Sequence, residues 1–315
     1  MNLQKFRRFP ARELERSCGR LGGQIGWLYH LLDRGGRISD AIADPWSAAL
    51  RLIPKPIIRW SCHRGRGPLV SVIVATRNNE RTIGKSLKSL LDQTHRNIEV
   101  IVIDDASDDD SLKIINDIAR RDLRVSVIQN PRQLGTGRSR NLGLRAARGD
   151  YVTFHDGDDL SLPTRVAVQL AALTKSPGKK MSVCNYVRVD SMGRALEING
   201  RRVMKCIISM MFPRNEVLER VGYFEKCSVS EDSDLYERIK IEFGASCEIL
   251  VFRTLYEALF RPQSSFFSDV KIESFDGAAV RFFRNEASLN ALAGINERHQ
   301  LMREGKMQVF VGCDN

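Results

Sequence analysis

The 315-residue chain carries a net charge of +11 with 43% hydrophobic residues, a composition typical of a globular protein with ample material for a core. Its longest apolar run, near 69–75, is far shorter than the roughly 18 residues of a membrane-spanning helix, and the basic start leads into no apolar segment, so we expect no signal peptide. Seven cysteines, odd in number and without a CxxC pair, argue against a disulfide framework or a zinc site and for reduced thiols in the cytoplasm.

The N-terminal region is the most basic part of the chain. Residues 1–68 hold 13 Lys and Arg against 5 Asp and Glu, which accounts for +8 of the net charge. We expect helices over 13–32 and 38–53, so that 1–67 forms a basic helical extension and linker. This region could meet an anionic membrane surface or an acidic partner, or simply present a solvated helical face. No nucleic-acid motif accompanies the charge and aromatic residues make up only 7%, so we expect no nucleic-acid partner.

From residue 69 the pattern changes to short apolar strands that alternate with amphipathic helices. The strands are predicted at 69–75, 98–104, 125–128 and 151–154, and the helices between them carry apolar residues at helical spacing. This alternation predicts a mostly parallel, Rossmann-like α/β sheet with helices on both faces. Ligands of such sheets bind outside the carboxyl ends of the strands, so the loops after Ala75, Asp104 and Phe154 should meet at one edge.

The second half of the chain predicts a smaller, antiparallel portion. A helix follows Pro163, a half-buried strand covers 181–189, and a turn at 190–193 leads into an antiparallel stretch that reaches residue 208. The elements expected beyond it are helices at 215–224 and 234–243, a strand near 249–256, and helices after 270. We therefore divide the chain into the extension 1–67, a main domain 68–260 with halves 68–160 and 161–260, and a helical C-terminal extension 261–315.

Acidic clusters follow the second and the fourth strand. One contains Asp104, Asp105 and Asp108–Asp110, and the other contains Asp156, Asp158 and Asp159. Carboxylates gathered at neighbouring strand ends suit a hard divalent cation, which in turn can bridge a diphosphate. The less specific alternatives are that an Asp-x-Asp triplet arises by chance in a solvated turn, and that Asp108–Asp110 only cap the following helix.

The order of these motifs resembles that of the family 2 glycosyltransferases, which are nucleotide-sugar enzymes of the GT-A fold. The resemblance is carried by VSVIVATRNNERTIGKSLKSLLDQTHRNIEVIVIDDASDDDS (70–111), GRSRNLGLRAARGDYVTFHDGDD (137–159) and SEDSDLYERI (230–239), and it covers about residues 69–260. It implies inverting, hexosyltransferase-type transfer from a nucleotide-sugar donor, UDP-linked by preference, to a glycan or lipid-linked acceptor in cell-surface polysaccharide biosynthesis. It also implies Mg²⁺ or Mn²⁺ as cofactor.

The resemblance assigns roles residue by residue. Asp105 matches the carboxylate that binds the base, and Thr76 and Arg77 match the first-loop positions that line the nucleotide. Arg140 matches the arginine near the base or phosphates. In the DxD motif, Asp158 would hold the metal, while Asp156 would bind the ribose or sugar and contribute to the metal site. Asp232 matches the general base for the acceptor hydroxyl, with Glu231 beside it on the acceptor side.

Simpler interpretations exist for several of these residues. Arg140 could be a solvated residue on a basic helix, and SVSE (228–231) is a capping-box pattern, so Glu231 and Asp232 could merely stabilise a helix start. His155, where the family usually has an apolar residue, is expected to be structural.

Departures from the family pattern limit the expectation. Arg77 replaces the usual aromatic residue of the first loop, Ser233 replaces a frequent Trp, and no QxxRW-like segment occurs, which argues against a processive synthase. The alternatives are a non-catalytic nucleotide-sugar-binding protein or another metal-dependent nucleotide-sugar enzyme on the same fold. We expect the protein in the cytoplasm, with peripheral contact at the inner face of the membrane through its basic N-terminal region.

Overall fold

A computed structural model of the chain describes residues 67–226, 230–261 and 269–313. The two predicted N-terminal helices and nearly all of the basic extension lie outside the described residues.

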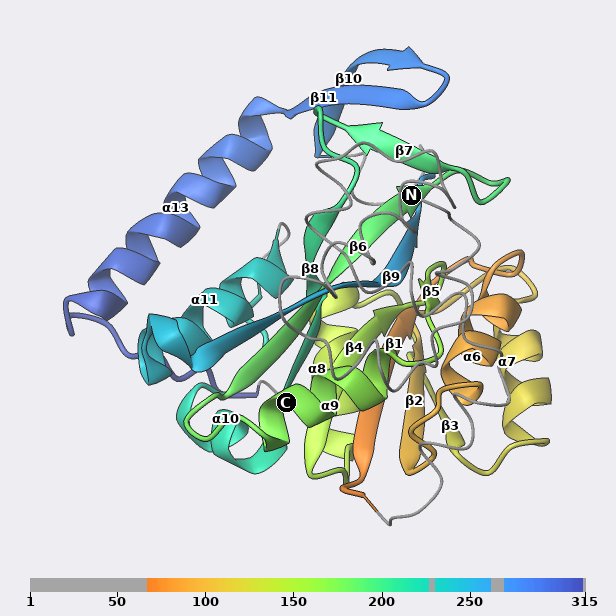
Figure 1. Cartoon of the computed structure of the whole chain (residues 1–315), viewed down its shortest axis with the longest axis horizontal. Coiled ribbons are helices and arrows are strands. Elements are labelled where there is room, and N and C mark those ends of the chain that lie inside the picture. Colours follow the sequence, from red (N-terminus) through yellow and green to blue (C-terminus); the bar gives the residue numbers. More distant parts are fainter. Residues whose placement is uncertain (1–66, 227–229, 262–268, 314–315) are drawn as a thin grey trace, which may run out of the picture.

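The predicted parallel sheet is confirmed. Its strands are β1 (Val70–Thr76), β2 (Ile98–Asp104), β3 (Val125–Gln129) and β4 (Tyr151–Asp156), in the spatial order β4-β1-β2-β3 (Figure 1). Each neighbouring pair is parallel. The whole length of β1 and β2 is buried, as expected for continuous β-branched runs that are covered on both faces.

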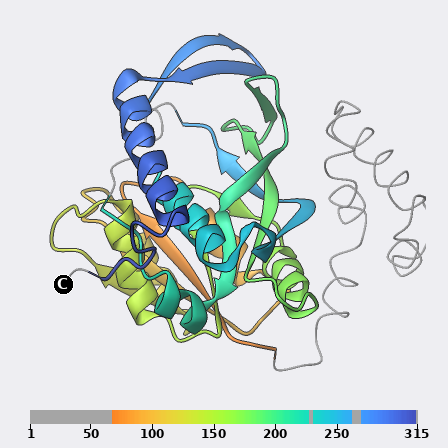
Figure 2. The ribbon, with the colours of Figure 1, turned by 90° about the vertical axis from the view of Figure 1, so that its left-hand side faces the viewer.

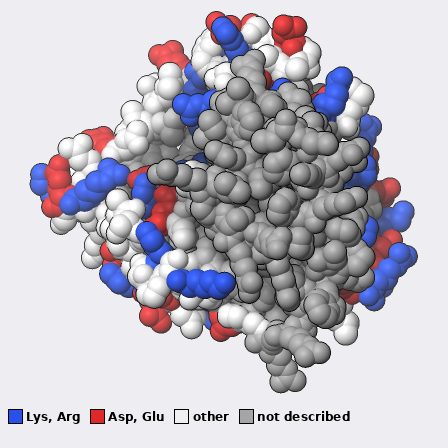
Figure 3. Space-filling model, in the orientation of Figure 1, with Lys and Arg blue, Asp and Glu red and all other residues white. Residues whose placement is uncertain are grey.

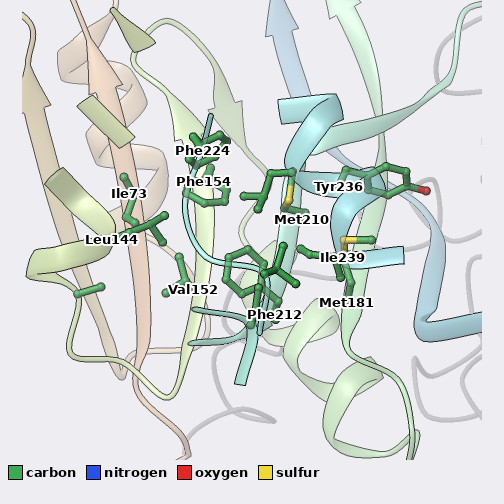
Figure 4. Packing of buried hydrophobic residues seen from close by; sticks show 14 of the residues in the cluster. Ile73, Leu144, Val152, Phe154, Met181, Met210, Phe212, Phe224, Tyr236 and Ile239 are labelled. Atoms are coloured by element: carbon green, nitrogen blue, oxygen red, sulfur yellow. The ribbon is translucent and has the colours of Figure 1, made fainter. Parts of the chain in front are cut away.

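Helices cover both faces of this sheet, because successive strand residues point to opposite sides. On one face, Val72 and Val74 pack in a cluster with residues of α6 (Ile83–Leu91), α7 (Ser111–Ala119) and α9 (Arg165–Thr174). On the other face, Ile73 and Phe154 belong to a cluster that includes residues of α8 (Thr136–Ala146), α10 (Arg214–Arg220) and α11 (Glu231–Phe243) (Figure 4).

The second half forms the predicted, mainly antiparallel portion of the same sheet. Its strands are β5 (Leu160–Ser161), β6 (Met181–Val189), β7 (Ala195–Ile198), β8 (Met204–Pro213) and β9 (Glu248–Leu259), with a short 3-10 turn at Ala245–Cys247 before β9. β8 runs antiparallel to both β4 and β6, so it joins the two portions. β9 is the exception, because it pairs parallel with β6.

The prediction of helices directly after residue 270 is wrong for the first part of this segment. β10 (Val270–Asp276) and β11 (Ala279–Arg284) form an antiparallel hairpin, and only then does α13 (Glu286–Arg303) begin. The Asp276-Gly277 pair between apolar alternating stretches is a hairpin signal, and Gly277 takes a positive φ of 50°. The C-terminal extension is therefore a hairpin followed by a helix.

The C-terminal segment packs back on the main domain and does not extend from it. α13 lies against α11 (Figure 2), and the segment after it adds a bridge in which Val311 N donates to Val221 O and Tyr223 N donates to Val311 O. The helix predicted at 215–224 corresponds to α10, which ends at Arg220, four residues earlier than expected. The helix predicted at 234–243 corresponds to α11, which begins at Glu231, three residues earlier than expected.

In the described residues that remain visible in Figure 3, acidic and basic side chains are interspersed. Among the helices of the described residues, none combines the length and apolar character that crossing a membrane requires. Cys184, Cys206, Cys247 and Cys313 have free thiols in the described part of the chain.

Candidate functional site

The parallel register brings three strand ends to the same edge of the sheet. Thr76 at the end of β1 is paired with Asp104 at the end of β2, and Ala75 is paired with Asp156 at the end of β4 (Figure 1). The backbone continues this alignment, because Asp105 N donates a hydrogen bond to Thr76 O. The loops after β1, β2 and β4 therefore meet, as the sequence predicted.

A cleft of about 1180 Å³ opens at this edge. All eight residues that the sequence singled out line it, and they come from both halves of the domain: Thr76, Arg77, Asp105, Arg140, Asp156, Asp158, Glu231 and Asp232. The structure thus places Asp105, Asp158 and Asp232 around one shared space. Their individual roles stay predictions.

Asp105 is buried and its carboxylate anchors the loop that precedes α8. Oδ1 accepts hydrogen bonds from Asn130 Nδ2 at 2.7 Å and from Leu134 N at 2.8 Å, and Oδ2 accepts one from Gly135 N at 2.9 Å. Asn130, which also donates to Ser139 Oγ, was not found from the sequence. The only signal for it was its position just after the third strand, at the same sheet edge.

Gly157 permits a close approach between the ends of β1 and β4. A Cβ atom at this position would lie 2.3 Å from Thr76 Oγ1, well inside van der Waals contact. Thr76 Oγ1 is itself fixed as acceptor from Asn79 Nδ2 at 2.9 Å. The glycine between the two aspartates is therefore required by the packing of the two loops.

Arg140 links the DxD segment to the start of α11. Its side chain is only 5% exposed; Nη2 lies 2.8 Å from Asp156 Oδ1 and Nη1 lies 2.8 Å from Glu231 Oε1. Burial works against the charged guanidinium, but the adjacent carboxylates outweigh it and raise the pKa of Arg140. The alternative of a solvated helix residue is wrong, and the contact joins two carboxylates that are 75 positions apart.

Asp158 is paired with a residue that the sequence did not indicate. Arg261, just after β9, places Nη2 2.5 Å from Asp158 Oδ2, and both residues line the cleft. Burial raises the pKa of Asp158, Arg261 opposes that rise, and the negative charge of Asp156 adds to it. No pattern around Arg261 marks it, since the contact joins residues 103 positions apart.

Asp159, the third aspartate of the cluster, has a structural role. Its Oδ1 accepts a hydrogen bond from Leu259 N at 2.9 Å, which ties the turn after β4 to the end of β9. Burial, followed by the charge of neighbouring Asp158, raises its pKa well above the ordinary value for aspartate. His155 is structural too, as predicted: it is fully buried and hydrogen-bonds Ser86 Oγ, Asp159 O and Ser161 Oγ.

Glu231 and Asp232 open α11 without a capping box. The residue before them, Ser230, is in the left-handed region at φ 57° and makes no side-chain cap hydrogen bond. Glu231 faces Arg140, and burial raises its pKa while Arg140 opposes the rise. Asp232 Oδ1 accepts a hydrogen bond from Ser233 N at 2.8 Å, and no described cation lies within ion-pair distance of it. Of the two carboxylates, Asp232 is therefore the one without a described cationic partner.

Asp108–Asp110, the second part of the acidic cluster after β2, precede α7 and do not line the cleft, although Asp110 makes no side-chain cap hydrogen bond there. Asp109 accepts hydrogen bonds from Ser111 N and Glu80 N, and Asp110 occupies the N-cap position of α7. These residues hold the loop after β1 against the start of α7.

The described residues contain no group of three or more His, Cys, Asp or Glu that is placed to hold a metal ion by itself. Asp156 and Asp158 both line the cleft, each with an arginine as its neighbour. A cation at this position would therefore take most of its ligands from a bound molecule or water, with these carboxylates as hard oxygen donors.

Comparison with known proteins identifies the family of the chain. The family model of glycosyl transferase family 2 matches residues 71–228, half of the chain. The chain belongs to this family. The matched stretch contains the strand ends, α8 and the DxD segment, while Glu231 and Asp232 lie just beyond it.

Relatives of this family 2 member match less than half of the chain. An uncharacterized glycosyltransferase of Haemophilus influenzae is 37% identical over 131 residues, which are 42% of this chain and 52% of that protein. The UDP-Glc:alpha-D-GlcNAc-diphosphoundecaprenol beta-1,3-glucosyltransferase WfaP of Escherichia coli is 41% identical over 102 residues, or 32% of this chain and 40% of the enzyme. The chain thus spans about half the length of these relatives or less.

The fold is also found among solved structures. The crystal structure of Staphylococcus aureus TarS 1–349 in complex with UDP-GlcNAc superposes with a TM-score of 0.56 at 22% identity, over 74% of this chain and 66% of that one. At this identity the likeness concerns the fold alone. It agrees with the GT-A architecture that the motifs of this family 2 glycosyltransferase predicted.

Proposed function

We propose that this family 2 member transfers a sugar, a hexose by preference, from a nucleotide-diphosphate donor to an acceptor hydroxyl with inversion at the anomeric carbon. The observation that carries the proposal is the single cleft that the donor-side residues and Asp232 line together. At about 1180 Å³ the cleft is large enough for a nucleotide-sugar together with part of an acceptor.

The donor nucleotide is proposed to lie over the ends of β1 and β2. Thr76 and Arg77 line this part of the cleft, with Asp105 below the loop that leads into α8. We favour a UDP-sugar, because Asp105 corresponds to the carboxylate that usually binds a uracil imide in the family 2 glycosyltransferases. Arg77, in place of an aromatic residue, adds a guanidinium that is suited to stack on a base or to bind phosphate.

Asp158, with Asp156, is proposed to hold Mg²⁺ or Mn²⁺. The donor set fits, because carboxylate oxygens are preferred by both ions and the mutual repulsion of the two aspartates favours a divalent partner. When bound, such an ion would supply Lewis-acid stabilisation of the negative charge that grows on the leaving group. Arg140 holds Asp156 in place during this step and adds a buried positive charge beside the cleft.

Asp232 is proposed as the general base. It is the second residue of α11 and lines the same cleft as the DxD segment, and among the described residues its side chain is hydrogen-bonded only by Ser233, through N and Oγ. A base that removes the proton from the attacking hydroxyl contributes about 10²–10⁴ in rate. Because attack from that side is a single displacement, inversion follows. Glu231, bound to Arg140, fixes the start of the helix on the acceptor side.

The acceptor is proposed to be a glycan or a lipid-linked saccharide of cell-surface polysaccharide biosynthesis. The name of the Escherichia coli relative includes such a lipid diphosphate acceptor. A second cavity of about 380 Å³ adjoins the cleft through Tyr186 and Arg188, on the acceptor half. For a lipid-linked acceptor, the basic residues 1–67 would bind the inner face of the membrane from the cytoplasm, which co-sedimentation with anionic vesicles tests.

Hydrolysis of a panel of nucleotide-sugars, together with calorimetric titration with UDP and GDP in the presence of Mn²⁺, tests the proposal. An enzyme should hydrolyse its own donor slowly, and Asp232→Asn should abolish turnover while it leaves nucleotide binding intact. The matched control is Asp92→Asn, which removes a carboxylate from an exposed ion pair with Lys88. Nucleotide binding without any turnover would instead indicate a binding protein, and full activity of Asp232→Asn would refute the base assignment.

A further inference from the structure

Arg261 stands at the end of β9, where it provides the positive charge next to Asp158. Its Nη2 lies 2.5 Å from Asp158 Oδ2, and the side chains of Arg261 and Asp158 are 31% and 14% exposed. Both line the main cleft. The carboxylate proposed to bind the metal therefore already has a monovalent counterion from its own chain.

Arg140 and Arg261, the two cleft arginines that pair with the aspartates of the DxD segment, differ in how firmly they are held. Arg140 is 5% exposed and lies between two carboxylates, so each of its two Nη atoms already forms an ion pair. Arg261 is more exposed and forms its ion pair with one carboxylate. Of the five N–H donors of a guanidinium, Nε of Arg261 is buried and donates to none of the described residues. Nε of Arg140 likewise donates to none of the described residues, but both of its Nη atoms already face carboxylates, whereas Arg261 uses only Nη2 for its ion pair.

A guanidinium and a divalent cation compete for the oxygens of Asp158, because both need the same negative charge. Once the cation is bound, its positive charge repels a guanidinium at 2.5 Å from the same carboxylate. Phosphate oxygens next to the cation are then the nearest strong acceptors, and the planar fork of arginine matches them in bidentate fashion.

We propose that Arg261 exchanges partners when the donor binds: it neutralises Asp158 in the ligand-free protein and binds the donor diphosphate once a divalent cation has taken Asp158. This inference rests on the proposed function and adds to it the residue that recognises the diphosphate. Arg261 then stabilises the leaving nucleoside diphosphate together with the metal. Arg140 keeps its two carboxylates throughout.

The exchange predicts effects of opposite sign for Arg261→Gln. Without its competitor, Asp158 should bind Mn²⁺ alone about two- to fivefold more tightly, as expected for the loss of a partly exposed ion pair. UDP binding at saturating Mn²⁺ should weaken about tenfold or more, because hydrogen bonds to a charged phosphate are lost. Arg261→Lys, which keeps the charge but not the fork, should fall between the wild type and Arg261→Gln in both measurements.

The experiment measures Mn²⁺ binding by electron paramagnetic resonance and UDP binding by calorimetry on the full chain, without any turnover assay. Arg194→Gln is the matched control, since Arg194 also pairs with one carboxylate, Asp190, but on the surface at 65% exposure. It should change neither affinity. Circular dichroism and the thermal midpoint show whether Arg261→Gln is folded.

Three results would overturn the exchange: both affinities weaken together, which is the mark of a structural residue; only the Mn²⁺ affinity changes; or neither changes. If the wild type binds neither UDP nor GDP in the presence of Mn²⁺, the proposed function itself fails. If the wild type binds UDP normally and Arg261→Gln binds it equally well, only the role of Arg261 is refuted.

Discussion

Replacement of Arg140 by glutamine is the most informative perturbation of the folded domain. The substitution keeps a polar side chain but leaves Asp156 and Glu231, whose side chains are 34% and 18% exposed, without their shared counterion. Removal of one member of a buried ion pair costs about 3–5 kcal/mol. Because the two carboxylates keep some contact with water, we expect a somewhat smaller loss, about 2–4 kcal/mol, at pH 7.

The stability lost in Arg140→Gln should decrease as the pH falls. Burial already raises the pKa of Glu231 above its ordinary value of 4.5, and Arg140 opposes that rise, so the variant should have a still higher pKa for Glu231 in the folded state. A carboxyl group with a raised pKa in the folded state destabilises the protein when it is ionised. The deficit should therefore be full above the raised pKa and shrink as the pH falls toward 4.5 and the group becomes protonated.

Urea denaturation followed by circular dichroism at pH 7 and at pH 5 measures both quantities. Arg120→Gln serves as control, because the ion pair of Arg120 with Asp117 is on the surface of α7, with the arginine 73% exposed, and should contribute about 0.2–1 kcal/mol at most. An Arg140→Gln variant that is no less stable than the control, or one whose deficit is larger at pH 5 than at pH 7, would refute the account of a buried charge network.

Three further predictions concern single positions. Asp232→Asn should lower transfer by about 10²–10⁴ with an unchanged dissociation constant for UDP, as measured by product formation and calorimetry; equal losses in both would point to misfolding instead. Gly157→Ala should lower the free energy of unfolding by about 1–3 kcal/mol in a urea titration, because its Cβ would meet Thr76 Oγ1 at 2.3 Å; a silent substitution would show that the loop relaxes freely. Asp234→Asn should lower the free energy of unfolding by about 3–5 kcal/mol, visible as a lower thermal midpoint, because Arg238 (0% exposed) would lose its ion pair. A decrease below about 1 kcal/mol would contradict this prediction.

The buried group around Asp234 also links the C-terminal helix to the site. Asp234 accepts hydrogen bonds from Arg238 Nε at 2.8 Å and from His299 Nε2 of α13 at 2.9 Å. Burial acts to raise the pKa of Asp234, but these partners outweigh it and lower the pKa below 3.8. The lowered pKa stabilises the fold above the ordinary aspartate pKa, and that stability is lost as the pH falls through the lowered value. α13 is thereby attached to the helix that carries Asp232.

Several site residues could be predicted because their position follows from strand order. Asp105 and Asp156 come directly after buried strands, and parallel strands must bring their carboxyl ends to one edge, so their approach requires no knowledge of packing. The motif order then identified Arg140 and Asp232, although local periodicity does not indicate that Arg140 contacts both Asp156 and Glu231. The hairpin at 270–284 was missed even though its Asp276-Gly277 signal was present.

Arg261, Asn130 and His299 could not be predicted in the same way. Each acts through a contact with a residue far along the chain, such as the 103 positions between Arg261 and Asp158, and no local pattern distinguishes such a side chain from a solvated one. Long-range ion pairs depend on which surfaces the antiparallel strands and the C-terminal helix bring against the sheet. That arrangement is a property of the packed domain.

The amino-acid sequence by itself determined the parallel sheet, the edge at which ligands meet it and the acidic residues at that edge, because hydrophobic periodicity and strand ends are local properties. Only the tertiary structure decided the partners of those acids: Arg140 for Asp156, Arg261 for Asp158 and the backbone before α8 for Asp105. The physical reason is that a buried charge must find its counterion in space, and the fold decides which distant cation is near enough.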